Sequence, residues 1–279
     1  MVAPSLRIML APTSVDAIIL TKNSVKPCLK ECLDSVYKNI PVHNMIAVDG
    51  GSTDGTLELL KQYPNAKIIM DRNGNRATSR QLGIEAVQTD WFVFLDSDII
   101  LCDNWFEYVK PYLKDPRVGA VWGAALQRSA SDLARYSAMG RLYGKDELWI
   151  AVKAGRKRGL THDTIVRTKA VEGIVIPQDL HVLEDHYIRM HVEKMGYRWL
   201  SVPKPYCYHH AHARERPKDY FTFGRAARKL GFLKLPTVLM YIFLGVPKSL
   251  WIYLTTGSKR AAKAQYVTYI YIIKGWLSA

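Results

Sequence analysis

The sequence from Val15 to Leu95 alternates between apolar strand patterns and amphipathic helix patterns, and this alternation constrains the fold more than any other feature. Short apolar runs predict strands, and the segments between them predict helices. Strict alternation is typical of an α/β fold with a mostly parallel sheet and helices on both faces. The predicted strands are 15–20, 45–48, 66–70 and 91–95, and the predicted helices are 27–38, 56–63 and 78–87.

The rest of the chain gives weaker local signals. Residues 111–167 are rich in Gly, Arg and Lys and predict a mobile loop. A helix is expected from Leu183 to Lys194, ended by Gly196 in a left-handed conformation. The 279 residues are 48% hydrophobic and 23% charged, which excludes a disordered or collagen-like chain. The four cysteines form no C-x-x-C pair, so neither a disulfide framework nor a structural zinc site is expected.

Two carboxylates follow the most apolar strand, where Trp91–Leu95 leads into Asp96, Ser97 and Asp98. Open α/β sheets bind ligands at the carboxyl edge of their strands. If the extended conformation continues, both side chains point the same way, about 7 Å apart at roughly 3.3 Å per residue. One cation and its ligand can bridge that separation. The alternative is a solvated turn or helix cap, but the buried strand favours a ligand site.

A second polar loop, residues 49–55, follows the strand 45–48 and precedes a helix. Its glycines let the backbone approach a ligand closely, and Ser52, Thr53 or Asp54 can cap the helix. No Gly-Lys-Ser/Thr sequence follows and no G-x-G-x-x-G is present, which excludes a P-loop and a dinucleotide fingerprint. Asp49 is therefore a ligand candidate at the same sheet edge as Asp96.

Four segments in order, 18–23, 48–56, 76–84 and 94–98, resemble the nucleotide-sugar half of family 2 glycosyltransferases. Glu184-Asp185, residues 194–198, Val202-Pro203 and Tyr208-His209 resemble the acceptor half of that family. The resemblance covers about residues 15–105 and 165–230. It implies the GT-A fold and an inverting transfer from a nucleoside-diphosphate sugar.

The resemblance also implies roles for individual residues. Thr21 and Asn23 would contact the nucleotide, Asp49 the base or ribose, Arg80 the diphosphate, and Asp96 the ribose or the metal. Asp98 and His209 would bind Mn²⁺ or Mg²⁺, which suit carboxylate and diphosphate oxygens. Because strand neighbours face opposite ways, His210 or His212 could take the place of His209.

The resemblance makes Asp185 the general base that accepts the proton of the acceptor hydroxyl. Taken alone, Glu184 and Asp185 would simply favour the first turn of a helix. If the acceptor is a lipid phosphate, the nucleophile is already ionised and the base matters less.

The sequence departs from the family at positions that help to recognise the base. Lys22 stands where Tyr is common, Gly50 where a second Asp is common, Asn75 where Gly is common, and Gln81 where Asn is common. The donor therefore stays open between UDP- and GDP-linked sugars.

The C-terminal 66 residues hold most of the chain's net charge of +14, because twelve Lys and Arg face only two acidic residues there. An 18-residue apolar stretch, 237–254, is interrupted by Pro247 and Lys248, which favours two short helices lying in an anionic membrane surface. A spanning helix or packing on the core are the alternatives. A peripheral or monotopic protein on the cytoplasmic face of the membrane, with a lipid-linked or glycan acceptor, is expected.

The expected organisation is an N-terminal extension (1–14), a nucleotide-sugar-binding half (15–105), an acceptor-binding half (106–213) and a basic apolar helical tail (214–279). A polyprenyl-phosphate sugar synthase of the same fold is the alternative enzyme. A sugar-1-phosphate nucleotidyltransferase is disfavoured, because the loop after the first strand lacks glycine. Outside enzymes, the basic tail would suit a nucleic-acid-binding protein, but no nucleic-acid motif is present and no such partner is expected.

Overall fold

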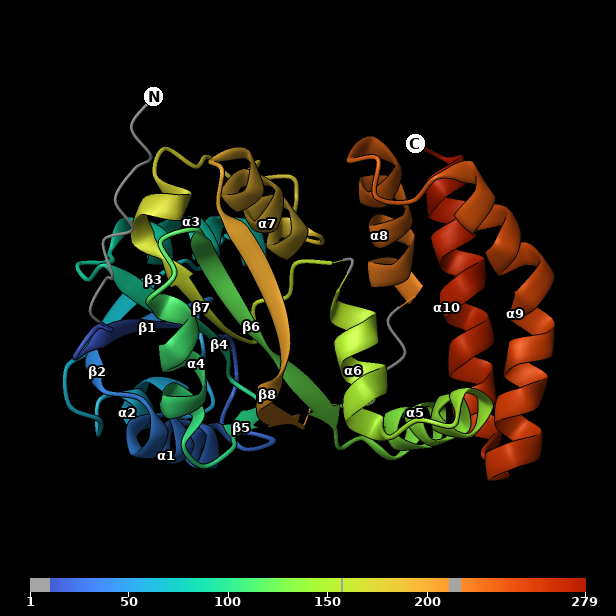
Figure 1. Cartoon of the computed structure of the whole chain (residues 1–279), viewed down its shortest axis with the longest axis horizontal. Coiled ribbons are helices and arrows are strands. Elements are labelled where there is room, and N and C mark those ends of the chain that lie inside the picture. Colours follow the sequence, from blue (N-terminus) through green and yellow to red (C-terminus); the bar gives the residue numbers. More distant parts are fainter. Residues whose placement is uncertain (1–10, 157, 211–216) are drawn as a thin grey trace. The chain divides into compact units, whose positions relative to one another are not determined.

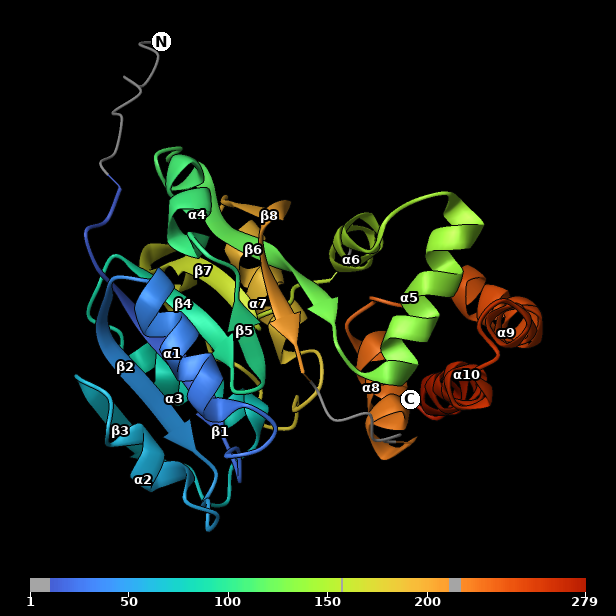
Figure 2. The same ribbon diagram turned by 90° about the horizontal axis from the view of Figure 1, so that it is seen from below.

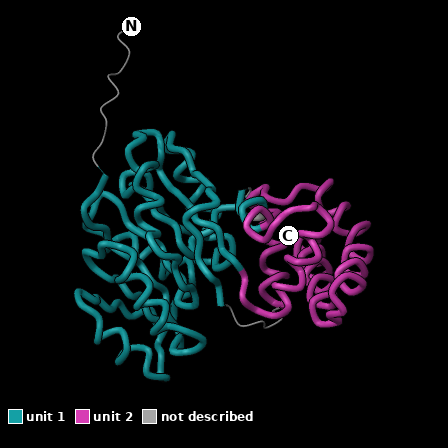
Figure 3. The backbone as a smooth tube through the Cα atoms, turned by 60° about the horizontal axis from the view of Figure 1, so that its bottom comes forward, with its two compact units in different colours: residues 1–126, 151–210 teal, residues 127–150, 211–279 magenta. Residues whose placement is uncertain are grey.

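The computed structural model describes residues 11–156, 158–210 and 217–279. These residues divide into two compact units, 1–126 with 151–210 and 127–150 with 211–279 (Figure 3). Residues 127–150, which the sequence assigns to the acceptor-binding half, therefore belong to the second unit.

The first unit is an α/β structure built on one eight-stranded sheet with the order β3-β2-β1-β4-β7-β6-β8-β5 (Figure 1). The strands are β1 (Val15–Thr21), β2 (Val42–Asp49), β3 (Ala66–Met70), β4 (Trp91–Asp96), β5 (Ile99–Leu101), β6 (Val118–Gln127), β7 (Asp163–Arg167) and β8 (Arg198–His209). The helices are α1 (Leu29–Asn39), α2 (Thr56–Leu60), α3 (Arg76–Glu85), α4 (Trp105–Leu113), the 3-10 helix η1 (Thr168–Val171) and α7 (Glu184–Lys194). Helix α6 (Glu147–Gly155) runs from the second unit into the first.

The alternation predicted from Val15 to Leu95 is confirmed, with each element within a few residues of its expected bounds. The strands β3, β2, β1 and β4 are parallel, as expected. The sheet as a whole is mixed, because β4 pairs antiparallel with β7, β6 with β7, and β5 with β8. Gly196 ends α7 with a φ of 85°, also as expected.

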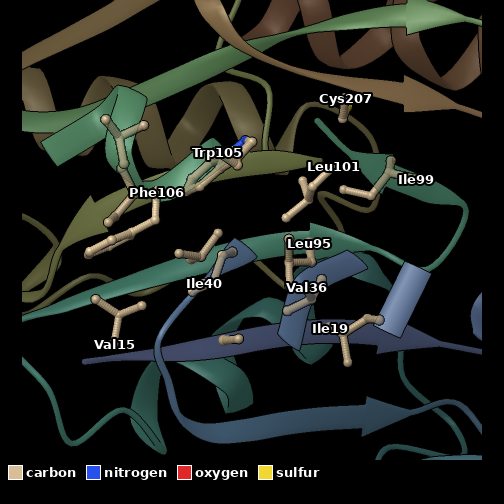
Figure 4. Packing of buried hydrophobic residues seen from close by; sticks show 14 of the residues in the cluster. Val15, Ile19, Val36, Ile40, Leu95, Ile99, Leu101, Trp105, Phe106 and Cys207 are labelled. Carbon is tan, nitrogen blue, oxygen red and sulfur yellow. The ribbon is translucent and has the colours of Figure 1, made fainter. Parts of the chain in front are cut away.

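Side chains of the central strands alternate between two apolar layers, one on each face of the sheet. Ile19 and Leu95 pack with α1 and α4 on one face (Figure 4), the face that carries both helices in Figure 2. Ile18 and Phe94 point to the opposite face and pack with α3 and α7. This period of two explains why β1 and β4 have near-continuous apolar sequences: both of their faces are buried.

The mobile loop predicted over 111–167 is wrong. This segment contains β6, α5 (Ala130–Tyr143), α6 and β7. At least two of the glycines in this segment are required by close packing instead. A Cβ on Gly119 would lie 2.5 Å from Cβ of Tyr197, and one on Gly123 would lie 2.3 Å from Oδ2 of Asp163. Only glycine lets β6 lie so close to its neighbours.

The two short helices predicted on either side of Pro247 are also wrong. The second unit contains α8 (Pro217–Lys229), one continuous α9 (Leu235–Thr256) with Pro247 inside it, and α10 (Lys259–Leu277). A proline removes one backbone donor, and packing of the helix compensates for that loss. Tyr241 of α9 stacks on Tyr269 of α10 with ring centroids 4.5 Å apart, so the two helices pack side by side across the proline.

Candidate active site

The carboxyl ends of β1, β2 and β4 bring the predicted nucleotide-binding residues to one edge of the sheet. Parallel pairing sets Thr21 opposite Asp49, and Leu20 opposite Asp96. Because the strands are parallel, their ends meet at the same edge. The loop after β2 and the turn after β4 therefore lie at the same edge of the sheet, on either side of β1, as the sequence predicted.

Asp49 is fully buried, and its carboxylate holds the loop that follows β2. Oδ2 accepts hydrogen bonds from the hydroxyls of Thr21 (2.7 Å) and Ser52 (2.6 Å). Oδ1 accepts the backbone N–H groups of Gly51 (2.8 Å) and Ser52 (2.7 Å). Burial raises the pKa of Asp49, but the hydrogen bonds from Ser52, Thr21 and Gly51 outweigh it and hold that pKa below its usual value.

Asn23 ties the first loop to the second. Its side-chain Oδ1 accepts the backbone N–H of Thr53 at 2.9 Å, and its own N–H donates to the hydroxyl of Ser52 at 2.8 Å. The side chain of Lys22 lies over Gly50, where an added Cβ would be 3.0 Å from Cδ of Lys22. The two departures from the family pattern at positions 22 and 50 are therefore in contact with each other.

Asp96, Asp98 and His209 form a group whose ligand atoms all lie within 4.8 Å of one another. The strand β4 ends at Asp96, and Ser97 and Asp98 form a turn into β5. Antiparallel pairing of β5 with β8 then sets Ile99 opposite His209. The extended conformation considered for Asp98 is thus replaced by a tight turn, and this turn brings the two carboxylates closer together.

Asp98 and His209 interact directly. Nε2 of His209 lies 3.2 Å from Oδ1 of Asp98, and the backbone N–H of His210 donates to the carbonyl of Asp98 at 2.8 Å. Burial raises the pKa of Asp98, but the hydrogen bond and charge of His209, together with a backbone hydrogen bond and the charge of His162, hold that pKa below its usual value. Two carboxylates and one imidazole are a donor set that fits Mn²⁺ and, less well, Mg²⁺. His212 lies outside the described residues.

Arg80 connects this group to the Glu184-Asp185 pair. It is 4% exposed, with Nε 3.2 Å from Oε1 of Glu184, Nη2 3.5 Å from Oδ1 of Asp96, and its guanidinium 5.1 Å from the ring centroid of Phe94. Burial and the neighbouring Asp185 raise the pKa of Glu184 more than Arg80 lowers it. Within the described part of the chain, Nη1 of Arg80 and Oε2 of Glu184 have no hydrogen-bond partner.

Asp185 lies in the first turn of α7 and is buried. Its Oδ2 is 2.8 Å from Nη2 of Arg158, and its Oδ1 accepts the backbone N–H of His186 at 2.7 Å. The position of Asp185 is thus fixed by an ion pair and by the helix N-terminus.

Sequence analysis missed His162 and Asp163, which lie next to the group of Asp96, Asp98 and His209. The ring of His162 stacks on that of His209 with centroids 5.9 Å apart. Nε2 of His162 accepts the indole N–H of Trp122 (3.1 Å), so Nδ1 carries the proton and donates to Asp163 (2.7 Å). Burial raises the pKa of Asp163. No motif marks these residues, and they lie in the segment taken for a loop. Arg158 was missed for the same reason.

Comparison with known proteins identifies the family of the chain. The sequence model of a family described as glycosyl transferase family 2 matches residues 16–172, more than half of the chain. The chain is 34% identical over 88 residues to the teichoic acid poly(glycerol phosphate) polymerase of Staphylococcus epidermidis, covering 29% of this chain and 12% of the polymerase. It is 30% identical over 88 residues to the cholesterol galactosyltransferase of Borreliella burgdorferi, covering 30% and 25%. The match thus spans a quarter or less of either relative.

Solved structures share the fold at low sequence identity. The mannosyltransferase PcManGT from Pyrobaculum calidifontis, in complex with GDP-Man and Mn²⁺, has a TM-score of 0.64 at 17% identity, over 99% of this chain and 89% of that one. Residues 1–349 of TarS from S. aureus, in complex with UDP-GlcNAc, give 0.58 at 16% identity, over 94% and 90%. The GT-A fold that the motifs implied is confirmed.

Proposed function

Because the chain belongs to glycosyl transferase family 2, we propose that it moves a sugar, with inversion, from a UDP- or GDP-linked donor to a lipid-linked or membrane-proximal glycan acceptor. The observation that carries this proposal is the group of Asp96, Asp98 and His209 at the carboxyl edge of the sheet. Its oxygen and nitrogen ligands, next to the guanidinium of Arg80, suit a diphosphate with a bound cation. Neighbours of the same fold bind GDP-Man with Mn²⁺ and UDP-GlcNAc.

On the donor side, some residues would bind the metal or the diphosphate, and others hold the loops that would receive the nucleotide. Asp98 and His209 would hold Mn²⁺ or Mg²⁺, with Asp96 as a third ligand or a contact to the ribose. The cation would neutralise charge on the leaving diphosphate. Arg80 supplies a second positive charge beside Asp96, where it would favour the charge of a diphosphate. Thr21, Asn23 and Asp49 shape the backbone surface that receives the nucleotide.

On the acceptor side, Asp185 is proposed as the general base. The acceptor oxygen forms a bond to the anomeric carbon, its proton passes to the carboxylate of Asp185, and the sugar–phosphate bond breaks with its electrons on the diphosphate. Arg158 positions Asp185 through their 2.8 Å ion pair. With a lipid phosphate as acceptor, as in a polyprenyl-phosphate sugar synthase, no proton needs to be removed. Product analysis separates the two reactions.

The tail is proposed to bring the enzyme to the cytoplasmic face of an anionic membrane. By length and composition, α9 is able to cross a membrane: it has 22 residues, and an 18-residue stretch within it has a mean hydropathy of 1.5 and is 17% buried. Its exposed side chains include Leu239, Phe243 and Val246. Exposed apolar surface of this extent beside basic residues is typical of a membrane-binding segment.

A thermal-shift panel tests the donor site. The full chain is heated with UDP, GDP, CDP or dTDP, each with and without Mn²⁺. Ligand at about a hundred times its Kd adds about 2.7 kcal/mol, which raises Tm by several degrees at roughly 2–4 °C per kcal/mol. The expected result is a Mn²⁺-dependent shift with one nucleotide that Asp98→Ala abolishes and Asp103→Ala, an exposed carboxylate paired with Lys38, retains. No shift with any nucleotide would refute the proposal.

A further inference from the structure

The second unit contains a cavity of about 350 Å³ formed by α5, α9 and α10, and none of its lining residues is among those assigned to sugar transfer, which belong to the first unit. Its size lies in the range of small-molecule sites. Its walls are almost entirely apolar or aromatic: Met139, Leu142, Tyr143, Met240, Tyr241, Leu244, Pro247, Lys248, Trp251 and Tyr269. Leu142 and Leu244 are about half exposed, so the cavity reaches the surface beside apolar side chains.

Among the described residues that line this cavity, Lys248 is the one that carries a charge. Its ammonium donates to the hydroxyl of Tyr269 at 3.0 Å and lies 5.5 Å from the centroid of the same ring. Among the residues that the structure describes, no carboxylate lies within 4.0 Å of this ammonium. The guanidinium of Arg135, which is paired with Asp132, acts on this ammonium with a charge of the same sign. A cation in apolar surroundings without a counter-charge is costly, and an anion would relieve that cost.

The walls decide which anion fits. An inorganic phosphate would lose its hydration against apolar side chains and gain only one ammonium and the phenolic hydroxyls. An amphiphile with an anionic head satisfies both parts of the cavity, because its phosphate meets Lys248 and its methylenes meet Leu244, Trp251 and Met139. Each buried methylene contributes about 0.8 kcal/mol. Met240 and Leu244 of α9 line the cavity and are about half exposed, so its apolar wall extends to the surface.

We propose that the cavity formed by α5, α9 and α10 binds the phosphate-bearing end of a membrane lipid, with Lys248 and Tyr269 holding the phosphate and the apolar walls holding the first part of the chain. The proposal extends the membrane association suggested above and rests on it. The site is separate from sugar transfer, so its test measures binding alone and can fail independently of the enzymatic proposal.

The test measures binding of dodecyl phosphate, kept below its micellar concentration, to the full chain by calorimetry. Two control ligands each carry one half of dodecyl phosphate: inorganic phosphate has the charged head without the alkyl chain, and dodecyl maltoside has the alkyl chain without the charge. Dodecyl phosphate is expected to bind at least about tenfold more tightly than either, and Lys248→Met is expected to weaken it at least about tenfold. Lys248→Arg should retain binding, as should Lys263→Met, the same change at an exposed lysine of α10.

Three results would overturn the proposal. Equal binding by Lys248→Met would mean adsorption to the apolar surface, and binding of inorganic phosphate as tight as that of dodecyl phosphate would mean a free-phosphate site. If Lys248→Met does not fold, Leu244→Trp fills the cavity from a half-exposed position while leaving the lysine in place. Undiminished dodecyl phosphate binding by Leu244→Trp would equally place the lipid elsewhere.

Discussion

Asp49 ends β2 and Asp98 follows β4, the two strands on either side of β1, and their carboxylates differ in what their oxygen atoms contact. Asp49 accepts four hydrogen bonds from Thr21, Gly51 and Ser52, and is fully buried. Asp98 shares its carboxylate with His209 and forms a group with Asp96 whose ligand atoms converge. Both carboxylates follow an apolar strand in the same kind of motif. The motif therefore predicts where each one lies, but it does not show which of them binds a ligand. Saturation of the carboxylate by the chain's own donors indicates a structural role, and convergence on a shared point indicates a ligand.

The largest effect is expected from Asp98→Ala. Transfer activity should fall by about three orders of magnitude, because the metal's stabilisation of the leaving diphosphate is worth several kcal/mol. The free energy of unfolding should change by about 1 kcal/mol or less, since one hydrogen bond to His209 is lost. Sugar transfer at increasing Mn²⁺ and urea unfolding provide the two readouts, with Asp103→Ala as the control. A stability loss as large as that of Asp49→Ala would remove the distinction between the two carboxylates.

Asp49→Ala is expected to act in the opposite way. It removes the acceptor of four hydrogen bonds and leaves two backbone N–H groups of the loop without their partner. Unsatisfied buried donors cost about 1–3 kcal/mol each, so the free energy of unfolding should fall by about 3 kcal/mol in urea. Asp49→Asn keeps one acceptor oxygen and should lose less. If Asp49→Ala unfolds like the wild type and loses only nucleotide affinity, Asp49 contacts the ligand directly.

A third carboxylate, Asp163, packs against Gly123 of β6. Gly123→Ala would place a Cβ 2.3 Å from Oδ2 of Asp163, and overpacking of this kind costs about 1–3 kcal/mol. Displacing Asp163 should also disturb His162, which stacks on His209, and so weaken Mn²⁺ binding. Gly50→Ala is the matched control, because only the flexible side chain of Lys22 has to move. A loss of stability with unchanged Mn²⁺ affinity would show that Asp163 supports β6 and not His209.

The same glycines mark the limit of what the sequence could predict. Strands β1 and β4 and the second half of β2 are buried on both faces, so each has a continuous apolar run in its local sequence. At Gly119 and Gly123 the cause lies in Tyr197 and Asp163, which are distant in sequence. No local pattern contains that information. The prediction that the helix breaks at Pro247 was wrong for the same reason. The packing of α9 depends on residues of α10, which the local sequence of α9 does not contain.

The residues of the candidate site also differ in whether the local sequence could predict them. Residues carried by motifs, such as Asp96, Asp98 and His209, do converge, because strand ends and antiparallel pairing place them. The partners that hold them have no motif. Arg158 against Asp185 and His162 against His209 depend on a segment whose strands and helices are fixed by contacts with the rest of the unit.

The smallest effect is a pH dependence that separates Asp49 from an ordinary surface carboxylate. The pKa of Asp49 is lower in the folded chain than its unfolded value, near 3.9. Its ionised form therefore stabilises the fold fully above that unfolded value, and this contribution is lost as the pH falls through the folded pKa. The gap in unfolding free energy between wild type and Asp49→Asn should be constant above about pH 5 and narrow below about pH 4. Urea unfolding from pH 6 to pH 3 measures it, with the exposed Asp103→Asn expected to show almost no gap at any pH because its ion pair with Lys38 is solvated. A gap that widens as the pH falls would mean that the loop prefers a protonated Asp49, and the hydrogen bonds from Gly51 and Ser52 would then not be what holds it.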